Sequence, residues 1–339
     1  MVKVFKTRRL ALYDSYMSTR GAASSLDSQA MAVTRMEIQD AARRIAPYVR
    51  RTPVVELEPG AFRIDAGVFL KLEFMQHTGS FKPRGAFNFL LSNDVPKAGV
   101  IAASGGNHGA AVAYAAQQLG HPAEIFVPTI SPPNKVDRLR QYGAQVHVVG
   151  NDYSEALAAS KEHGARTGAL AIHAYDDPLV LAGQGTLAAE WEEQGHKLDS
   201  VLVAVGGGGL IGGVAAWFQG RTRVIAVEPE RAPSLHHALE AGHILDVEVG
   251  GVAADSLGAR RVGELMFPIA QKFVDRSLLV SDDQILAAQQ ALWQKLRIIT
   301  EPGGATALAA LISGVYRPAP GERVGVVLCG ANTDPAKLA

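Results

Sequence analysis

From about Gly99 onward, short apolar runs alternate with longer segments in which apolar residues recur at helical spacing. The short runs have the length of buried strands, and the longer segments favour amphipathic helices. The predicted strands are Val100–Ala103, Glu124–Val127, Gln145–Val149, Leu170–Ala174, Ser200–Val205, Val224–Glu228, Ser277–Val280 and Arg323–Leu328. The predicted helices include Ala110–Leu119, Asn134–Tyr142, Glu155–Glu162, Leu187–Gln194 and a long helix that Asp282 caps and that runs to Leu296.

This order of elements predicts the fold class. Strands that alternate with helices pair in parallel through right-handed crossovers, which is typical of α/β proteins. The strands are too many for one sheet of ordinary size, and 339 residues are enough for two domains. We therefore expect two domains, each an open, mostly parallel twisted sheet flanked by helices.

The charge balance and the cysteine content limit the binding partners and the cellular compartment that we expect. The chain has 33 basic and 33 acidic residues, so it has no net field that would attract nucleic acid or an anionic membrane. The uncharged segment 201–218 is near the lower length limit for a membrane span, but its glycines indicate a strand, a turn and a helix start. A single cysteine excludes an intramolecular disulfide and is consistent with a reducing cytoplasm. Residues 1–30 are basic, and we expect them to form a flexible N-terminal extension.

The first of several polar or glycine-rich stretches is Thr78–Ala86, which contains Lys82. Pro83 predicts that Lys82 stands at the start of a helix. The positive end of the helix dipole disfavours a charged lysine, and a lysine with a lowered pKa can act as a base or form a Schiff base. Taken alone, however, Lys82 is better interpreted as an ordinary solvated surface lysine, because most lysines are solvated.

Two further stretches lie between a predicted strand and a predicted helix. Ser104–Gly109 exposes backbone N–H groups at a helix start, which suits a carboxylate, although Asn107 capping an ordinary turn is the alternative. In Val205–Gly213, four successive glycines allow successive N–H groups to converge on a phosphate.

The glycines of this third stretch also fit a dinucleotide-binding fingerprint. Gly207, Gly209 and Gly212 have its spacing, and Glu228 ends the next strand where a ribose hydroxyl would need an acid. This pattern leaves open a nicotinamide-dependent oxidoreductase. Against that alternative, the fingerprint normally opens the first unit of its domain, whereas several strand–helix units precede it here.

Taken together and in this order, the stretches resemble the serine/threonine dehydratases, pyridoxal-phosphate enzymes of fold type II. The motifs are Ser80–Ala86, Ser104–Gly109, Ala182–Thr186, Gly206–Gly209, Glu301–Ala305 and Cys329–Asn332, and the resemblance runs from about Thr34 to Asp334. It implies a fold similar to the β subunit of tryptophan synthase. Residues 31–96 with 176–339 would form a large cofactor-binding domain, and residues 97–175 a small mobile domain that closes over the substrate.

The resemblance also implies a role for individual residues. Lys82 would be both the Schiff-base lysine and the general base. Two sets of residues would surround it, one for pyridoxal phosphate and one for the substrate carboxylate. The cofactor set is Phe81, Lys82, Asn107, Gly206, Gly207, Gly208, Gly209, Leu210, Glu301 and Cys329, with Cys329 at the pyridine nitrogen. The substrate set is Ser104, Gly105, Asn107 and His108.

The implied reaction converts L-threonine or L-serine to 2-oxobutanoate or pyruvate and ammonia. A lyase for another 3-hydroxyamino acid, such as threo-3-hydroxyaspartate, and a serine racemase are the alternatives. Racemases of the family carry a serine where this chain has Gly105, which disfavours racemisation. Relatives that bind a divalent metal have a second carboxylate where Ser234 stands, so we expect no metal beside Glu228. The resemblance further implies a homodimer or homotetramer, and it suggests no role for Tyr175.

Overall fold

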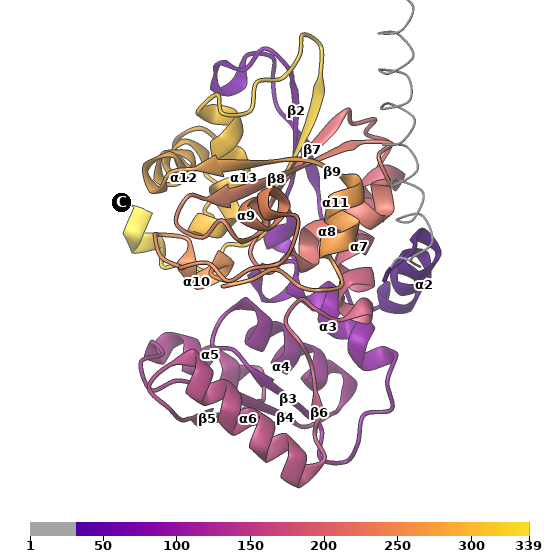
Figure 1. Cartoon of the computed structure of the whole chain (residues 1–339), viewed down its shortest axis with the longest axis vertical. Helices are drawn as coiled ribbons and strands as arrows, with labels where there is room; N and C mark the ends of the chain where they lie inside the picture. The colour runs from indigo at the N-terminus through magenta and orange to yellow at the C-terminus, as the bar shows by residue number, and fades with distance from the viewer. Residues whose placement is uncertain (1–31, 339) are drawn as a thin grey trace, which may run out of the picture. The chain divides into compact units, whose positions relative to one another are not determined.

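The computed structural model describes residues 32–338, so the predicted extension 1–30 lies outside the described residues. Two β-sheets organise this part of the chain (Figure 1). The larger has six strands in the order β1-β2-β10-β7-β8-β9, and the smaller has four in the order β5-β4-β3-β6. The α/β class with mostly parallel sheets, expected from the sequence, is confirmed.

In the six-stranded sheet, only β1 runs antiparallel to its neighbour. The sheet joins distant parts of the chain, because β2 pairs with β10. Its strands are β1 (Val54–Glu56), β2 (Gly67–Lys71), β7 (Ser200–Ala204), β8 (Arg223–Pro229), β9 (Val274–Val280) and β10 (Arg323–Val327). β2, β7, β8 and β10 are almost wholly buried, as expected of parallel strands covered on both faces.

Helices cover this sheet on both sides. Figure 1 shows α12 (Asp282–Leu296) and α13 (Pro302–Ile312) on one side, and α7 (Pro178–Glu193), α8 (Gly209–Phe218) and α11 (Phe267–Phe273) on the other. α2 (Arg35–Ile45) packs on α7, and α9 (Ser234–Ala241) packs on β8 and β9. The short helix α10 (Ala254–Leu257) contacts α13. Single 3-10 turns lie at Ala61–Arg63, Glu73–Met75, His77–Gly79 and Pro335–Leu338.

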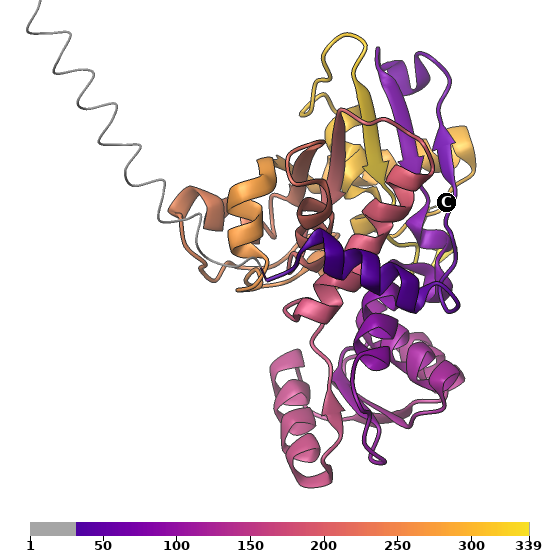
Figure 2. The ribbon, with the colours of Figure 1, turned by 90° about the vertical axis from the view of Figure 1, so that its right-hand side faces the viewer.

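The four-stranded sheet is entirely parallel. It comprises β3 (Val100–Ala103), β4 (Ala123–Val127), β5 (Gln145–Val148) and β6 (Leu170–Ala171), with α4 (Asn107–Leu119), α5 (Pro133–Gln141) and α6 (Tyr153–Thr167) between them. Ile125 and Val127 belong to the core that includes α4, whereas Phe126 packs in a separate cluster with residues of α6. The pleat of β4 therefore directs alternate side chains to two faces, with α4 on one and α6 on the other (Figure 2).

All eight predicted strands are present, with differences at their ends. β6 ends at Ala171, not Ala174, because the chain leaves the sheet toward α7. β9 begins at Val274, three residues before the predicted start. The segment 201–218 forms β7, a turn and α8, and no helix of the described chain is long and apolar enough to cross a membrane.

The predicted helices are present too, again with corrected ends. α7 begins at Pro178, where Asp177 accepts hydrogen bonds from two backbone N–H groups, well before the predicted Leu187. Ser281, not Asp282, caps α12 in a capping box with Gln284. The strands β1 and β2 precede the alternating pattern and were not predicted.

A buried network of charges holds the start of α3 (Lys82–Leu91) against the six-stranded sheet and α7. Arg84 pairs with Glu73 and, through Nη2, with Glu190 Oε2 at 2.9 Å. Lys71 Nζ of β2 lies 2.6 Å from Glu190 Oε1. Burial opposes the charge of Arg84, but Glu73 and Glu190 together raise its pKa above the usual value. The network therefore connects β2, α3 and α7 at the point where Lys82 enters its helix.

We expect Arg84→Met to destabilise the protein by about 3–5 kcal/mol, because it leaves Glu73 and Glu190 buried without their partner. Urea unfolding followed by far-UV circular dichroism measures this change. Arg43→Met is the matched control, since Arg43 pairs with Asp40 but its side chain is 72% exposed. Equal effects of the two substitutions would contradict a structural role for the buried network.

Glu228 at the end of β8 anchors the start of α9. Its Oε1 accepts a hydrogen bond from Leu235 N at 2.7 Å, and its Oε2 accepts from His236 N at 2.7 Å and from Ser277 Oγ at 3.0 Å. Burial nevertheless raises the pKa of Glu228 to about 7, with the hydrogen bonds opposing the shift. The carboxyl group therefore titrates near neutral pH.

This raised pKa makes stability depend on pH. A carboxyl whose pKa rises on folding contributes most below its unfolded value, near 4.5, and that contribution is lost as pH rises through 7. Between pH 5 and pH 8, the free energy of unfolding should fall by roughly 2 kcal/mol more in the wild type than in Glu228→Gln. Urea unfolding at both pH values measures the difference, with the exposed Glu248→Gln as control. Parallel pH profiles of wild type and Glu228→Gln would show that Glu228 does not titrate in this range.

Candidate active site

Lys82 is the first residue of α3, followed by Pro83 in the first turn, as the sequence predicts. Its Nζ donates a hydrogen bond to the carbonyl oxygen of Ala174 at 2.8 Å and lies 5.1 Å from the ring centre of Phe81. Burial lowers the pKa of Lys82 to about 8, and the neighbouring Cys329 and Glu301 reduce that shift. The alternative of a solvated surface lysine is therefore wrong, and desolvation is the main reason for the lowered pKa.

The stretch Ser104–His108 leads into α4. Gly106, not Asn107, occupies the N-cap position, so the alternative of an Asn107 cap is wrong. Ser104 Oγ accepts a hydrogen bond from Gly106 N at 3.3 Å. The first N–H groups of a helix have no partner within it, so this turn offers donors to an anion.

His108 and Asn107 project from the first turn of α4 toward different partners. His108 Nε2 lies 3.2 Å from the carbonyl oxygen of Ile172 and donates to it, which leaves Nδ1 as an acceptor. Burial, with a further contribution from Lys82, lowers the pKa of His108 to about 3, so the ring is neutral. Asn107 Nδ2 donates to Glu301 Oε1 at 2.6 Å.

Glu301 and Cys329 lie near Lys82 on segments distant in sequence. Glu301 is the N-cap residue of α13, and burial raises its pKa to about 7. Burial, followed by the charge of Glu301, raises the pKa of Cys329 to about 12. The thiol is therefore protonated, and it donates to the carbonyl oxygen of Gly303 at 3.4 Å. It is a neutral group, as the sequence interpretation of Cys329 requires.

The glycine loop Gly206–Gly209 connects β7 to α8. Gly208 is the N-cap residue with φ 90°, and Leu210 lies in the first turn. A Cβ on Gly207 would lie 2.3 Å from the ring of Tyr175, so only glycine fits there. The loop ends at a helix start, where unpartnered N–H groups favour a phosphate.

Tyr175 connects the glycine loop to Lys82. Its ring packs on Gly207, its Cβ and backbone pack on Gly209, and its hydroxyl donates to the carbonyl oxygen of Arg261 at 3.4 Å. The preceding residue, Ala174, is the acceptor for the Lys82 amine. Sequence reasoning found no role for Tyr175, because nothing in its neighbours along the chain indicates that it covers a loop thirty residues away.

Sequence reasoning also assigned no role to Asn332, and it left Arg138 open as a cation for a dicarboxylic substrate. Asn332 Nδ2 donates to the carbonyl oxygen of Thr78 at 2.8 Å and to Asn107 Oδ1 at 2.5 Å. Arg138 Nη1 donates to Asn332 Oδ1. Asn332 belongs to the motif Cys329–Asn332, and that motif is the sequence signal that could have identified it as a site residue. Arg138 lies on α5 outside every motif.

The arrangement fits pyridoxal phosphate. The amine of Lys82 is partly buried and easily deprotonated, and the glycine loop offers a helix start to a phosphate. In the described chain, Ser80 Oγ and Thr78 Oγ1 are buried without a hydrogen-bond partner, close to Lys82 in sequence. An unpaired buried hydroxyl costs free energy that a polar ligand can recover.

The dinucleotide alternative fits less well. It requires Glu228 to accept a hydrogen bond from a ribose, but both carboxylate oxygens already accept bonds at the start of α9. Ser234, the position at which metal-binding relatives have a carboxylate, donates to the carbonyl oxygen of Gly206 at 3.1 Å. These two residues support the backbone behind the glycine loop.

Comparisons with known proteins agree with this geometry. The family model described as "Pyridoxal-phosphate dependent enzyme" matches residues 24–330. The chain is 39% identical over 302 residues to L-threonine ammonia-lyase of Geobacter sulfurreducens, covering 88% of this chain and 75% of that protein. It is 38% identical over 301 residues to phenylserine dehydratase of Ralstonia pickettii, covering 87% and 92%. The solved structure of maize serine racemase matches with a TM-score of 0.86 at 34% identity, covering 91% and 96%. The chain therefore belongs to the pyridoxal-phosphate-dependent enzymes, in the family of the threonine dehydratases and serine racemases.

Proposed function

We propose that the protein is an ammonia-lyase that converts L-threonine, L-serine or both to 2-oxobutanoate or pyruvate and ammonia. The observation that carries this proposal is the environment of Lys82. Its amine has a pKa near 8, its charge acts on His108 at the start of α4, and its acceptor Ala174 adjoins Tyr175 on the glycine loop. These contacts support one site that combines a base, a carboxylate-binding helix start and a phosphate-binding helix start.

Bound at this site, pyridoxal phosphate supplies an electron sink for the carbon atom next to the substrate's amino group. The N–H groups of the glycine loop, together with Leu210, would hold the phosphate. Phe81 would flank the ring of the cofactor, and Asn107, held by Glu301 and Asn332, would hydrogen-bond its hydroxyl. Cys329, a protonated thiol, would be a weak and neutral partner for the pyridine nitrogen.

The substrate is held and deprotonated by the residues around α4 and α3. Ser104, Gly105, Asn107 and His108 bind the carboxylate at the start of α4, where the dipole favours an anion. Lys82 Nζ removes the α-proton, and its pKa near 8 leaves about a tenth of the amine neutral at pH 7. His108 is neutral, so it places no positive charge beside Lys82.

The names of the relatives support a β-hydroxyamino acid as the substrate, since they denote lyases for threonine and phenylserine. Arg138 favours a second candidate. Its guanidinium contacts Asn332, which contacts Asn107, so it provides a cation near the carboxylate-binding helix start. A dicarboxylic substrate such as threo-3-hydroxyaspartate would need such a cation.

The wider organisation is part of the proposal. Residues 31–96 with 176–339 would form the cofactor-binding domain, and residues 97–175, which contain the four-stranded sheet, would close over the substrate. We further propose that the protein works in the cytoplasm as a homodimer or homotetramer.

Visible absorption of the purified protein, before and after borohydride reduction, tests the assignment of Lys82. We expect a reducible chromophore and a single labelled peptide that contains Lys82. Lys82→Ala should lower the rate of 2-oxo acid formation by at least about 100-fold, because the general base is lost. The exposed Lys97→Ala is the control and should retain the wild-type rate.

The same assay, run with L-threonine, L-serine and threo-3-hydroxyaspartate, decides the substrate. Highest kcat/KM for threonine or serine agrees with the proposal, and a clear preference for hydroxyaspartate selects the second candidate. A colourless protein that binds a nicotinamide dinucleotide and has no reducible imine would refute the lyase function.

The glycine at position 105 leads to a prediction about the stereochemistry of the reaction with serine. With Lys82 on one face of the substrate and glycine in the position of the racemases' serine, the wild type should act on L-serine and leave D-serine unchanged. A Cβ on Gly105 would lie 3.5 Å from Ser131 Oγ and from Val127, which is ordinary contact, so Gly105→Ser should fold. We expect this variant to gain measurable racemisation while losing part of its elimination activity.

Chiral analysis of serine recovered after partial turnover in heavy water measures this gain. Gly105→Ala is the matched control, since it adds the carbon atom without the hydroxyl. If the wild type already forms D-serine at a rate comparable to pyruvate, another residue supplies the second proton and the argument from Gly105 is wrong.

A further inference from the structure

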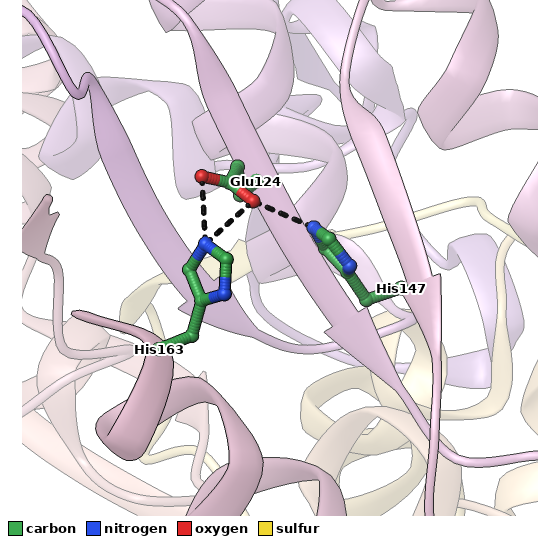
Figure 3. A group of neighbouring side chains, drawn as sticks. All are labelled: Glu124, His147 and His163. Carbon is green, nitrogen blue, oxygen red and sulfur yellow. Dashed lines mark hydrogen bonds and ion pairs between the residues drawn. The ribbon is translucent and has the colours of Figure 1, made fainter. Parts of the chain in front are cut away.

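Two histidines and a glutamate meet on the four-stranded sheet, outside the proposed active site (Figure 3). Glu124 Oε2 lies 2.6 Å from His147 Nε2 and 2.9 Å from His163 Nε2. The three residues come from β4, β5 and α6. Their possible ligand atoms all lie within 4.8 Å of one another, so one small ion could contact all of them.

The pleat of the sheet places this cluster away from Lys82. Glu124 and Phe126 are two residues apart on β4, so they share a face, and β4 pairs Phe126 directly with His147 on β5. Phe126 packs in the cluster on the α6 side, whereas Ile125 and Val127 face the core that contains α4. The cluster thus occupies the face opposite the helix that carries the carboxylate-binding turn.

The cluster is partly shielded from water. The side chains of Glu124, His163 and His147 are 15%, 18% and 26% exposed. The ring of Phe126 stacks on His147 with centroids 4.4 Å apart and forms an apolar floor next to His163. Partial burial reduces competition from water while leaving a path by which an ion can enter.

The donor set matches a particular kind of ion. Two imidazoles and one carboxylate are the protein ligands of many open zinc sites, in which water completes the tetrahedron. Imidazole nitrogens favour zinc and neighbouring transition metals over Mg²⁺ and Ca²⁺, which prefer oxygen ligands. The ligands also come from three elements, as expected of an ion that stabilises a tertiary arrangement.

We propose that Glu124, His147 and His163 bind one Zn²⁺ ion that links α6 to β4 and β5 and stabilises the four-stranded sheet. The ion would replace the hydrogen bonds that now join the two imidazoles to the carboxylate. This function is independent of the lyase reaction, because none of the three residues belongs to the proposed active site.

Binding requires both imidazoles to free Nε2, because each donates its Nε2 proton to Glu124. Arg166 Nη2 donates to His163 Nδ1 at 2.9 Å, which holds the His163 proton on Nε2. To bind zinc through Nε2, each imidazole must carry its proton on Nδ1 instead, and Arg166 must turn away from His163. Arg166 is exposed on the last turn of α6, which leaves it room to do so.

Zinc content of the holoenzyme after equilibrium dialysis against Zn²⁺ tests the proposal. We expect one tightly held equivalent per chain, and a weakening of at least about tenfold in Glu124→Gln, His147→Gln and His163→Gln. His237→Gln is the matched control, since His237 lies beside Glu240 on α9 in an exposed pair. It should bind zinc as the wild type does.

Two further measurements separate binding at this cluster from binding elsewhere. Zn²⁺ should raise the thermal midpoint of the wild type and of His237→Gln, but not that of His163→Gln. Co²⁺ bound to the wild type should show visible d–d absorption bands that are lost in His147→Gln. Zinc binding that all three glutamine variants retain, or no saturable binding by the wild type, would overturn the proposal.

Discussion

The proposed active site depends on a network of charged side chains that the fold buries away from water. Arg84 is 1% exposed, and it can remain charged there only because Glu73 and Glu190 accept its hydrogen bonds. The same contacts hold the first turn of α3 against β2 and α7, which gives Lys82 its position. Close packing supports this arrangement, because a Cβ on Gly183 of α7 would lie 2.5 Å from the carbonyl oxygen of Arg84. Because Arg84 lies two residues after Lys82, the ion pairs of Arg84 also help to position Lys82, the proposed base.

Desolvation then sets the protonation state of the groups around Lys82. It lowers the pKa of Lys82 to about 8 and that of His108 to about 3, and it raises the pKa of Cys329 to about 12. All three shifts favour the neutral form of each group. A site of this kind can take up a proton at Lys82 Nζ without competing charges from the histidine or the thiol. Because the chain belongs to the pyridoxal-phosphate-dependent enzymes, we attribute a role in the reaction to this neutral environment.

The segment between β6 and α7 contacts several of the candidate site residues. Ile172 accepts a hydrogen bond from His108, Ala174 accepts one from Lys82, and Tyr175 packs on the glycine loop. Asp176 accepts hydrogen bonds from the backbone of Glu264 and Leu265, which fixes the end of the segment beside α11. A short stretch of chain therefore contacts Lys82, the first turn of α4 and the glycine loop. Ile172 and Ala174 act through their backbone carbonyl groups, whereas Tyr175 and Asp176 act through their side chains.

Local sequence determined the elements, and the motifs proposed most of the candidate site residues. The alternation of apolar runs and helical segments depends only on neighbouring residues, so the strands from β3 onward, the α/β class and the start of α3 at Lys82 followed from it. The ordered motifs were sufficient to identify the pyridoxal-phosphate family.

The tertiary structure decided which residues far apart in the sequence come into contact. Asn332 contacts Asn107 from 225 residues away, Arg138 contacts Asn332 from 194 residues away, and Tyr175 covers a loop in another part of the fold. Glu124, His147 and His163 meet only because the register of β4 and β5 and the packing of α6 bring them together, and no spacing along the chain indicates such a meeting.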